Sequence, residues 1–520
     1  MPRLSSPVQW SQLFRLPDQP GLGLQARLRQ AMVQAMDSGR LVAGAPLPSS
    51  RELARLLGLS RNTVMAAFEQ LVDQGFLESR PRSGMIVAHR SGAQRPAPVV
   101  PSAGGRSRPP DWAQRLRRSL AEQRTLSKPE GWQAQPYPFV FGGFDEELFP
   151  AEAFRECCMR ALSRGRTARW AHDLESADLP DLVEQIRLHL LPRRGVFALD
   201  SEILVTVGAP QAFQLLAEAL CHADTRLGFE EPGHPHARNA FQWHRTPLVP
   251  LPLDSHGLKV DSLPPPDYVF VTPSHQSPTT VTLPIERRLA LLQCAEEQDM
   301  VVIEDDYEAE NLHTGTPMPA LKSLDKSGRV IYIGSLAKSL SPVLRLGYIV
   351  APQRLVAELR RLRHTAVRHP SSFLQQAWAL FIALGHHDRH ARQVNQLLRQ
   401  RLQLTLRAMA EQLPGFEVLP PQGGASLWVA APAWVDAAEL AELAQAQGVL
   451  IEPGNVFFAR PPYPCPWFRL RLSSIPTARI PAGIAALASA VRQLAIARGQ
   501  TGAATPGTAA PTRRLLRDSP

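Results

Sequence analysis

The chain has 520 residues, of which 44% are apolar, so two or three domains with real hydrophobic cores are expected. No apolar leader segment follows Met1 and no run of about 18 apolar residues occurs, so we expect a cytoplasmic protein with no membrane association. The five cysteines lack the paired spacing of zinc sites and disulfide frameworks, which predicts reduced thiols and no metal site.

The positive charge is concentrated at the N-terminal end. Lys and Arg outnumber Asp and Glu by 57 to 47, and residues 1–135 hold 19 basic and 9 acidic side chains, which leaves 38 of each sign in the rest. A basic head on a neutral body indicates a polyanion-binding module attached to a domain with a different task.

The basic head has the pattern of a winged helix-turn-helix. Residues 24–37 repeat apolar side chains at helical spacing, and 47–68 predict two further helices, with Ser49 or Ser50 and then Ser60 as N-caps and Gly58 between them. Residues 76–88 predict two strands joined by a basic turn. The alternative is a small helical bundle whose arginines form only a solvated face.

Composition divides the chain into four parts. We predict a DNA-binding domain over 22–90, a Pro/Arg-rich linker over 91–136, a large domain over 137–495 and a disordered tail over 496–520. Within the linker, the basic stretch 112–128 predicts a partial helix that could dock on either domain or add phosphate contacts.

The large domain is organised around a lysine on a tight turn. Lys338 lies between two apolar runs that predict short strands, 330–333 and 347–350. Such a lysine is usually a solvated turn residue. Upstream, however, the strand 301–307 ends in three acids and a tyrosine, and ligands sit at the carboxyl ends of parallel strands.

Together these residues supply the groups that aldimine chemistry needs. That chemistry requires an amine, a carboxylate that keeps a pyridine nitrogen protonated, a phenol near the ring hydroxyl and a cationic phosphate clamp. The sequence offers Lys338, Asp305, Tyr307 and Arg345 with Ser335. With this set, it resembles the fold-type I pyridoxal-phosphate (PLP) proteins of the aspartate aminotransferase class.

A narrower resemblance is carried by Asp305-Asp306-Tyr307 together with Thr-Pro-Ser-His-Gln at 272–276. Both strings resemble the MocR branch of the GntR regulators, and Leu-Pro-Ser-Ser-Arg-Glu-Leu-Ala at 47–54 resembles a GntR head. The resemblance covers nearly the whole chain outside the linker and the tail. It implies an α+β winged helix-turn-helix joined to an α/β fold-type I transferase domain with a small C-terminal subdomain.

The resemblance also implies roles for individual residues. Gly208 and Ala209 would bind the PLP phosphate, His234 would stack on the ring and Gln276 would lie beside the ring hydroxyl. From the sequence, His234 is equally compatible with an ordinary loop histidine. Arg469 would bind an effector carboxylate, with Arg471 as the competing choice. Residues expected to contact DNA are Ser49, Arg51, Ser60, Arg61, Asn62, Thr63, Arg82 and Gly84.

Four positions depart from the family pattern: Val207, Pro210, His234 and Thr280. Pro210 donates no amide, so a weaker phosphate cup is expected on its side. Thr280 replaces a glycine, which predicts a strained turn. The histidines at 386, 387 and 390 have no set of acids or cysteines at ligand spacing, so a metal site is not expected there.

Three functions are compatible with these residues. The leading one is a homodimeric transcriptional regulator that binds operator DNA and senses an amine, an amino acid or PLP. The alternative is an active aminotransferase with a DNA-binding head, since Lys338, Asp305, Tyr307, Arg345 and Arg469 suffice for a half-reaction. The third is a GntR-like repressor whose large domain senses a small acid without a cofactor.

Overall fold

The computed structural model describes residues 21–80, 84–88, 110–116, 123–142, 148–263, 265–313, 318–336 and 340–500, together with residues 10, 13, 14 and 16. The chain forms two compact units, 1–118 and 119–520. Lys338, Arg82, most of the predicted linker and nearly all of the predicted tail lie outside the described residues.

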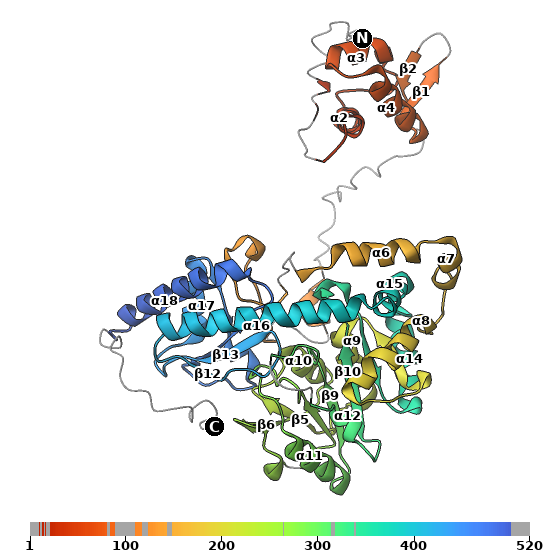
Figure 1. The fold of residues 1–520 in the computed structure, drawn as a ribbon. Helices are drawn as coiled ribbons and strands as arrows, with labels where there is room; N and C mark the ends of the chain where they lie inside the picture. The colour runs from red at the N-terminus through yellow and green to blue at the C-terminus, as the bar shows by residue number, and fades with distance from the viewer. Residues whose placement is uncertain are drawn as a thin grey trace. The chain divides into compact units, whose positions relative to one another are not determined.

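The first unit contains the predicted winged helix-turn-helix (Figure 1). Its elements are α2 (Leu24–Asp37), α3 (Ser50–Leu57), α4 (Arg61–Asp73), β1 (Leu77–Arg80), β2 (Gly84–Val87) and the short α5 (Trp112–Arg115). Ser49 caps α3 by accepting from Glu52 N at 3.2 Å, and Gly58 ends that helix with φ +66°. Ser60 caps α4 by accepting from Thr63 N at 3.1 Å. The predicted caps and turn are therefore confirmed.

The core of the first unit includes residues that precede the predicted boundary at 22. Trp10 and Phe14 are buried against the helices, and their rings stack with centroids 5.7 Å apart. They join apolar side chains from α2, α3, α4 and both strands.

The second unit is built on an eight-stranded sheet, counted among the described residues. The strand order is β4-β11-β10-β9-β8-β5-β6-β7. The strands are β4 (Ile203–Thr206), β5 (Leu227–Glu231), β6 (Leu248–Asp254), β7 (Gly257–Leu258), β8 (Tyr268–Val271), β9 (Val301–Asp305), β10 (Val330–Ser335) and β11 (Gly347–Val350). Strands β10, β9, β8, β5 and β6 run parallel, whereas β11 is antiparallel to both of its neighbours.

Helices cover both faces of this sheet, so its strands are buried on both sides. Along β9, Val302 packs in the same cluster as α11, and the next residue, Ile303, packs with α9 on the opposite face. The helices are α6 (Ala151–Ala161), α7 (Arg164–Trp170), α8 (Pro180–Gln185), α9 (Gly208–Leu220), α10 (Pro235–Trp243), α11 (Ile285–Glu297), α12 (Leu321–Leu324), α14 (Gln353–Val367) and α15 (Ser372–Ala383).

The long helix α16 (His386–Gln412) connects the sheet region to the C-terminal subdomain (Figure 1). The subdomain's antiparallel sheet has the order β12 (Glu417–Val418), β13 (Ser426–Ala430), β16 (Trp467–Arg471) and β15 (Glu452–Pro453). Helices α17 (Ala437–Ala446) and α18 (Ile480–Ala497) complete it, and β14 (Val449–Leu450) pairs with β3 (Tyr137–Pro138). The predicted fold-type I architecture with a small subdomain is confirmed.

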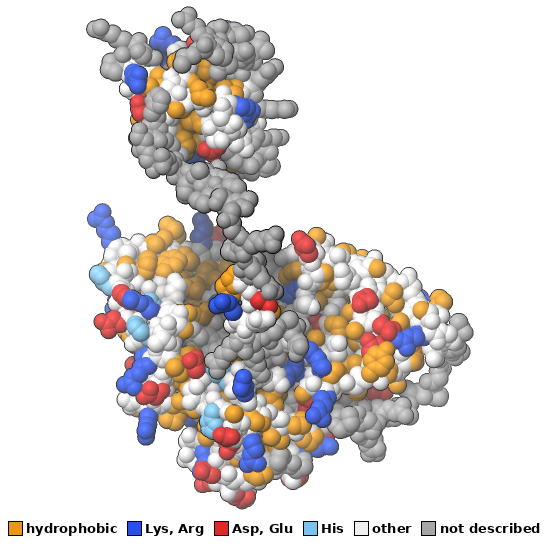
Figure 2. Space-filling model, turned by 180° about the vertical axis from the view of Figure 1, so that it is seen from behind, with side chains coloured by type: hydrophobic (Ala, Val, Ile, Leu, Met, Phe, Trp, Pro, Cys, Tyr) orange, Lys and Arg blue, Asp and Glu red, His pale blue; other side chains and the backbone are white. Residues whose placement is uncertain are grey.

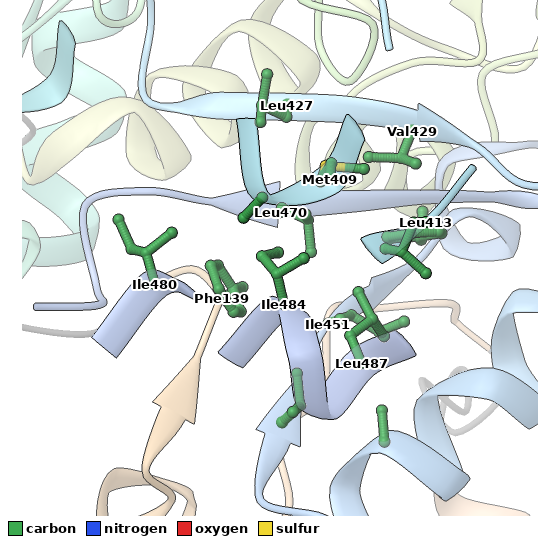
Figure 3. Close-up of a cluster of buried hydrophobic side chains, with 14 of the residues drawn as sticks. Phe139, Met409, Leu413, Leu427, Val429, Ile451, Leu470, Ile480, Ile484 and Leu487 are labelled. Atoms are coloured by element: carbon green, nitrogen blue, oxygen red, sulfur yellow. The ribbon is translucent and has the colours of Figure 1, made fainter. Parts of the chain in front are cut away.

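Residues at the start of the second unit are built into the core of this subdomain. Phe139, just after β3, is fully buried and lies among Ile480, Ile484 and Leu470 (Figure 3). The stretch Thr477–Ala497 is long and apolar enough to span a membrane by length and composition. Because Ile484 and Leu487 of α18 are buried in the same cluster, we interpret it as a core helix.

Acidic and basic side chains alternate over the visible face of the second unit (Figure 2). This agrees with its balanced composition, since the surplus of basic residues belongs to the head.

Candidate functional site

A cavity of about 330 Å³ opens at the carboxyl ends of the parallel strands in the second unit. Eight of the predicted cofactor and effector residues line it: Gly208, Ala209, His234, Asp305, Tyr307, Ser335, Arg345 and Arg469. Residues as far apart in the sequence as Gly208 and Arg469 thus meet at one site. Gln276 does not line the cavity, and Lys338 lies in the undescribed stretch 337–339 that follows Ser335 and Leu336.

Strand register explains why the acid and the hydroxyl meet. Asp305 is the last residue of β9 and pairs with Ile333 of the parallel neighbour β10, whose last residue is Ser335. Ser335 in turn pairs with Gly347 of β11, which pairs with Thr206 at the end of β4. Helix α9 begins two residues after Thr206, so its N-terminus lies at the same edge of the sheet.

The end of the cavity near α9 has the donors that a phosphate needs. Gly208 adopts φ +72°, and no side chain caps the helix behind it. A Cβ at Gly347 would lie 3.2 Å from Gly208 Cα, so the glycine allows β11 to approach this turn. Arg345 is exposed, and no acid among the described residues forms an ion pair with it. A helix N-terminus, the Ser335 hydroxyl and a free guanidinium suit a dianion.

The middle of the cavity has a carboxylate, a phenol and an imidazole. Asp305 is buried, and burial raises the pKa of Tyr307 above its usual range, so the phenol stays protonated. The His234 ring centroid lies 6.3 Å from that of Tyr307 and 5.7 Å from that of Phe213. His234 Nδ1 accepts from Ala237 N at 3.3 Å, so this histidine caps α10 and its neutral form carries the proton on Nε2.

Behind Asp305, Glu230 carries a proton near neutral pH. Its Oε2 accepts from Thr272 Oγ1 at 2.7 Å, and from Thr272 N and Gln276 Nε2 at 3.2 Å each. Burial raises the pKa of Glu230 to about 7, and the charge of Asp305 adds to this shift. Below about pH 7 the Glu230 carboxyl is therefore predominantly neutral.

The pKa of Glu230 predicts a pH-dependent stability. Between 4.5 and about 7 the folded protein keeps this proton while the unfolded chain releases it, so stability is lost as the pH rises through that window. Glu230→Gln has no titrating group at this position, so it should not lose this stability. Between roughly pH 5 and 8 the free energy of unfolding of the variant should rise by about 2–3 kcal/mol relative to the parent. Urea unfolding at both pH values measures the gain, with the exposed Glu218→Gln as the control. Parallel pH profiles of parent and variant would contradict the assignment.

Two arginines, Arg469 and Arg471, line the remaining end of the cavity; they are two residues apart in β16 and so share one face of the strand. Arg471 uses both terminal nitrogens in hydrogen bonds within the protein: Nη2 donates to Glu308 Oε1 at 2.6 Å and Nη1 donates to Ser426 Oγ at 2.9 Å. Arg469 donates from Nε to Glu452 Oε2 at 2.6 Å. Its two terminal nitrogens donate to no acceptor among the described residues. The geometry favours Arg469 over Arg471 as the ligand for a planar carboxylate.

Several cavity residues were not singled out from the sequence: Leu126, Phe141, Phe213, His236 and Ser277. Ser277 directly follows the predicted Gln276, and Phe141 precedes the glycine pair at 142–143, so local signals existed for these two. Leu126 lies within the predicted linker, where spacing gives no sign of a distant partner. Gln276 instead holds its own loop, donating from Nε2 to Pro232 O and Ser277 O at 2.9 Å each.

The histidine group at the start of α16 takes part in side-chain pairing. His387 is buried, with Nε2 3.2 Å from Glu310 Oε2; burial lowers its pKa, but the Glu310 charge outweighs this and leaves the pKa raised. The described parts of the chain contain no group of three or more His, Cys, Asp or Glu that could hold a metal ion.

The predicted DNA-contacting residues that the structure describes lie at the start of α3, at the start of α4 and at the start of β2. Ser49 and Ser60 are N-caps, and Ser60 Oγ also lies 2.8 Å from Thr63 Oγ1. Arg51, Arg61 and Asn62 are exposed on the first turns of their helices, and Gly84 begins β2 with φ +77°. The exposed donors at the start of α4 are available to base edges or phosphates.

Comparison with known proteins gives two family matches. Residues 156–487 match aminotransferase class I and II, and residues 24–87 match the gntR family of bacterial regulatory proteins. The HTH-type transcriptional regulator TauR of Rhodobacter capsulatus is 40% identical over 472 residues, covering 90% of this chain and 96% of TauR. The probable rhizopine catabolism regulatory protein MocR of Rhizobium meliloti is 34% identical, covering 82% of this chain and 85% of MocR.

Among solved structures, the α-aminoadipate aminotransferase LysN of Thermus thermophilus matches the large unit. It superposes with a TM-score of 0.67 at 25% identity, over 74% of this chain and 99% of LysN. That enzyme was crystallised with N-(5'-phosphopyridoxyl)-L-leucine.

Proposed function

Since this chain belongs to the MocR-type transcriptional regulators of the GntR family, we propose that its large unit binds PLP and an amine or amino acid effector in the cavity described above. The observation that carries the proposal is the gathering of eight separately predicted residues around that one cavity. Effector binding would then change how the helix-turn-helix binds operator DNA.

The residues present suit PLP at each end of the cavity. The α9 N-terminus, Ser335 and Arg345 would hold the phosphate, and Asp305 would pair with the ring nitrogen. Lys338 would attach the cofactor, which supplies an electrophilic carbon for amines. Tyr307, as a protonated phenol, would donate toward the ring oxygen, and Arg469 would bind an effector carboxylate.

We further propose a cytoplasmic homodimer, because paired winged heads suit paired half-sites on DNA. An effector can change DNA affinity only if it binds unequally to the DNA-competent and DNA-incompetent forms. The measurement that matters is therefore the DNA dissociation constant with and without effector at fixed salt.

The first test is the visible absorption spectrum after dialysis against PLP. We expect the parent to keep a band at roughly 420 nm and Lys338→Ala to lose it. Lys322→Ala is the matched control and should keep the band. Lys322 is a residue of α12, and its side chain pairs with Asp325 just after that helix. Absence of the band in the parent would leave a cofactor-free sensor joined to a DNA-binding head.

A second candidate function is transamination, favoured by the two terminal nitrogens of Arg469, which donate to no acceptor among the described residues. Steady turnover of an amino donor with a keto acid would establish it. Spectral change on adding an amine without continued product formation would leave the protein a sensor.

A further inference from the structure

One wall of the cavity is formed by the chain that leads in from the DNA-binding unit. Leu126 and Phe141 line the cavity. Arg124 Nη1 donates to Phe458 O and Ala459 O at 3.2 Å each, and Arg124 O accepts from Asn239 Nδ2 at 2.9 Å. Residues 123–141, here called the docking segment, therefore contact both the cavity and the large unit.

Glu452 joins the docking segment to the anion-binding arginine. Its Oε1 accepts from Phe141 N at 2.6 Å, and its Oε2 accepts from Arg469 Nε at 2.6 Å. The register of β15 and β16 places Glu452 directly opposite Arg469, and the glutamate is only 4% exposed. One buried carboxylate thus fixes both the guanidinium and the backbone of the segment.

A lysine of the docking segment lies close to this pair. Lys128 Nζ lies 4.1 Å from the centroid of the Trp132 ring and 5.4 Å from that of Phe141. Burial lowers the pKa of Lys128, and the charge of Glu452 opposes that shift. An anion added near Arg469 would stabilise the charged lysine further, and its carbon atoms would contact Leu126 and Phe141.

We propose that Glu452 is a positioning residue through which a carboxylate-bearing ligand at Arg469 holds the docking segment against the large unit. The proposal rests on the proposed function and names its regulation. Phe139 is anchored in the subdomain core (Figure 3) and separates Phe141, which Glu452 holds, from the upstream part of the segment. That upstream part therefore responds through ligand contact with Leu126 and through the charge of Lys128, which lies beside Phe141. In the sequence it continues toward the DNA-binding unit. By thermodynamic reciprocity, a change that loosens the docking segment lowers the affinity for the ligand by the same factor by which the ligand stabilises the docked segment.

An experiment without ligand tests, independently of PLP, whether Glu452 holds the docking segment in place. Hydrogen exchange of the full-length protein should be at least about fivefold faster in peptides from 123–141 for Glu452→Ala than for the parent. Glu452→Gln, which keeps an acceptor for Phe141 N, should restore part of the protection. Equal exchange in parent and Glu452→Ala would overturn this role of Glu452.

The second experiment uses N-(5'-phosphopyridoxyl)-L-alanine, with N-(5'-phosphopyridoxyl)ethylamine as the probe that lacks a carboxylate. The alanine conjugate should slow exchange in 123–141 by about tenfold, and the ethylamine conjugate should not. Glu452→Gln should lower the affinity for the alanine conjugate but not the affinity for the ethylamine conjugate. Equal responses to the two conjugates would overturn the coupling, whereas failure of both to bind the parent would overturn the proposed function and leave the ligand-free result standing.

The third experiment separates coupling from binding. Arg124→Gln removes the two carbonyl contacts without touching the cavity lining, so it should bind the alanine conjugate within about fivefold of the parent. The effect of that conjugate on operator affinity should be lost. Arg492→Gln, an exposed change on α18, is the control and should respond like the parent. An operator response of full size in Arg124→Gln would overturn the proposal.

Discussion

Replacing Arg363 by methionine is expected to lower the free energy of unfolding of the large unit by about 3–5 kcal/mol. The side chain is fully buried on α14. Its Nη1 donates to Asp178 Oδ1 and to Val205 O, and its Nη2 donates to Ser176 O at 2.5 Å. Methionine would remove the donors to Asp178 Oδ1 and Val205 O and one of the donors to Ser176 O. Arg360 Nη1 would still donate to Asp178 Oδ2 at 2.7 Å and to Ser176 O at 3.2 Å.

Arg361 on the same helix gives a matched control. Its side chain is 74% exposed and, among the described residues, pairs with Glu358 one turn away, so Arg361→Met should cost less than about 1 kcal/mol. Urea unfolding followed by far-UV circular dichroism measures both changes. Similar losses for the two variants would show that the buried cluster of Arg363 and Asp178 adds little.

Replacing Arg469 by methionine is expected to weaken the binding of N-(5'-phosphopyridoxyl)-L-alanine by at least about 100-fold. The variant loses the donors for the ligand carboxylate and leaves Glu452 buried without its cationic partner. The ethylamine conjugate lacks the carboxylate, so its affinity should fall far less. Calorimetric titration of both conjugates measures the difference.

Arg471→Met separates ligand binding from folding. Arg471 holds Glu308 and Ser426, so its loss should lower stability more than it lowers selectivity between the two conjugates. The exposed Arg460→Met should change neither property. If Arg471→Met rather than Arg469→Met abolished the preference for the carboxylate, the assignment of the two arginines would be reversed.

Local chemistry made much of the fold predictable from the sequence. Ser49 and Ser60 followed by helical repeats, with Gly58 between, indicate the helix-turn-helix because a cap acts within three residues of itself. Asp305 at the end of an apolar strand indicates a site for the same reason, since strand ends collect at one sheet edge. The left-handed Thr280, with φ +65°, also followed from its position in the turn.

The features that depend on distant contacts were not predictable in this way. Leu126 and Glu452 acquire their roles only when segments more than 300 residues apart meet. Arg363 stands in an arginine-rich helical repeat, which gives no sign that this one side chain is buried beside Asp178. The protonated state of Glu230 follows from burial near Asp305, which the sequence does not specify.

The paired charges at the effector end of the cavity have a consequence for ligand selection. Glu452 balances Arg469 and Glu308 balances Arg471, whereas Lys128, beside Phe141, forms no ion pair with a carboxylate of the described residues. A zwitterion with one carboxylate matches that single surplus charge. A dicarboxylic amino acid would bring a second anion to an end of the cavity where both arginines already face glutamates, so size and hydrophobic shape, rather than additional negative charge, should distinguish good ligands from poor ones.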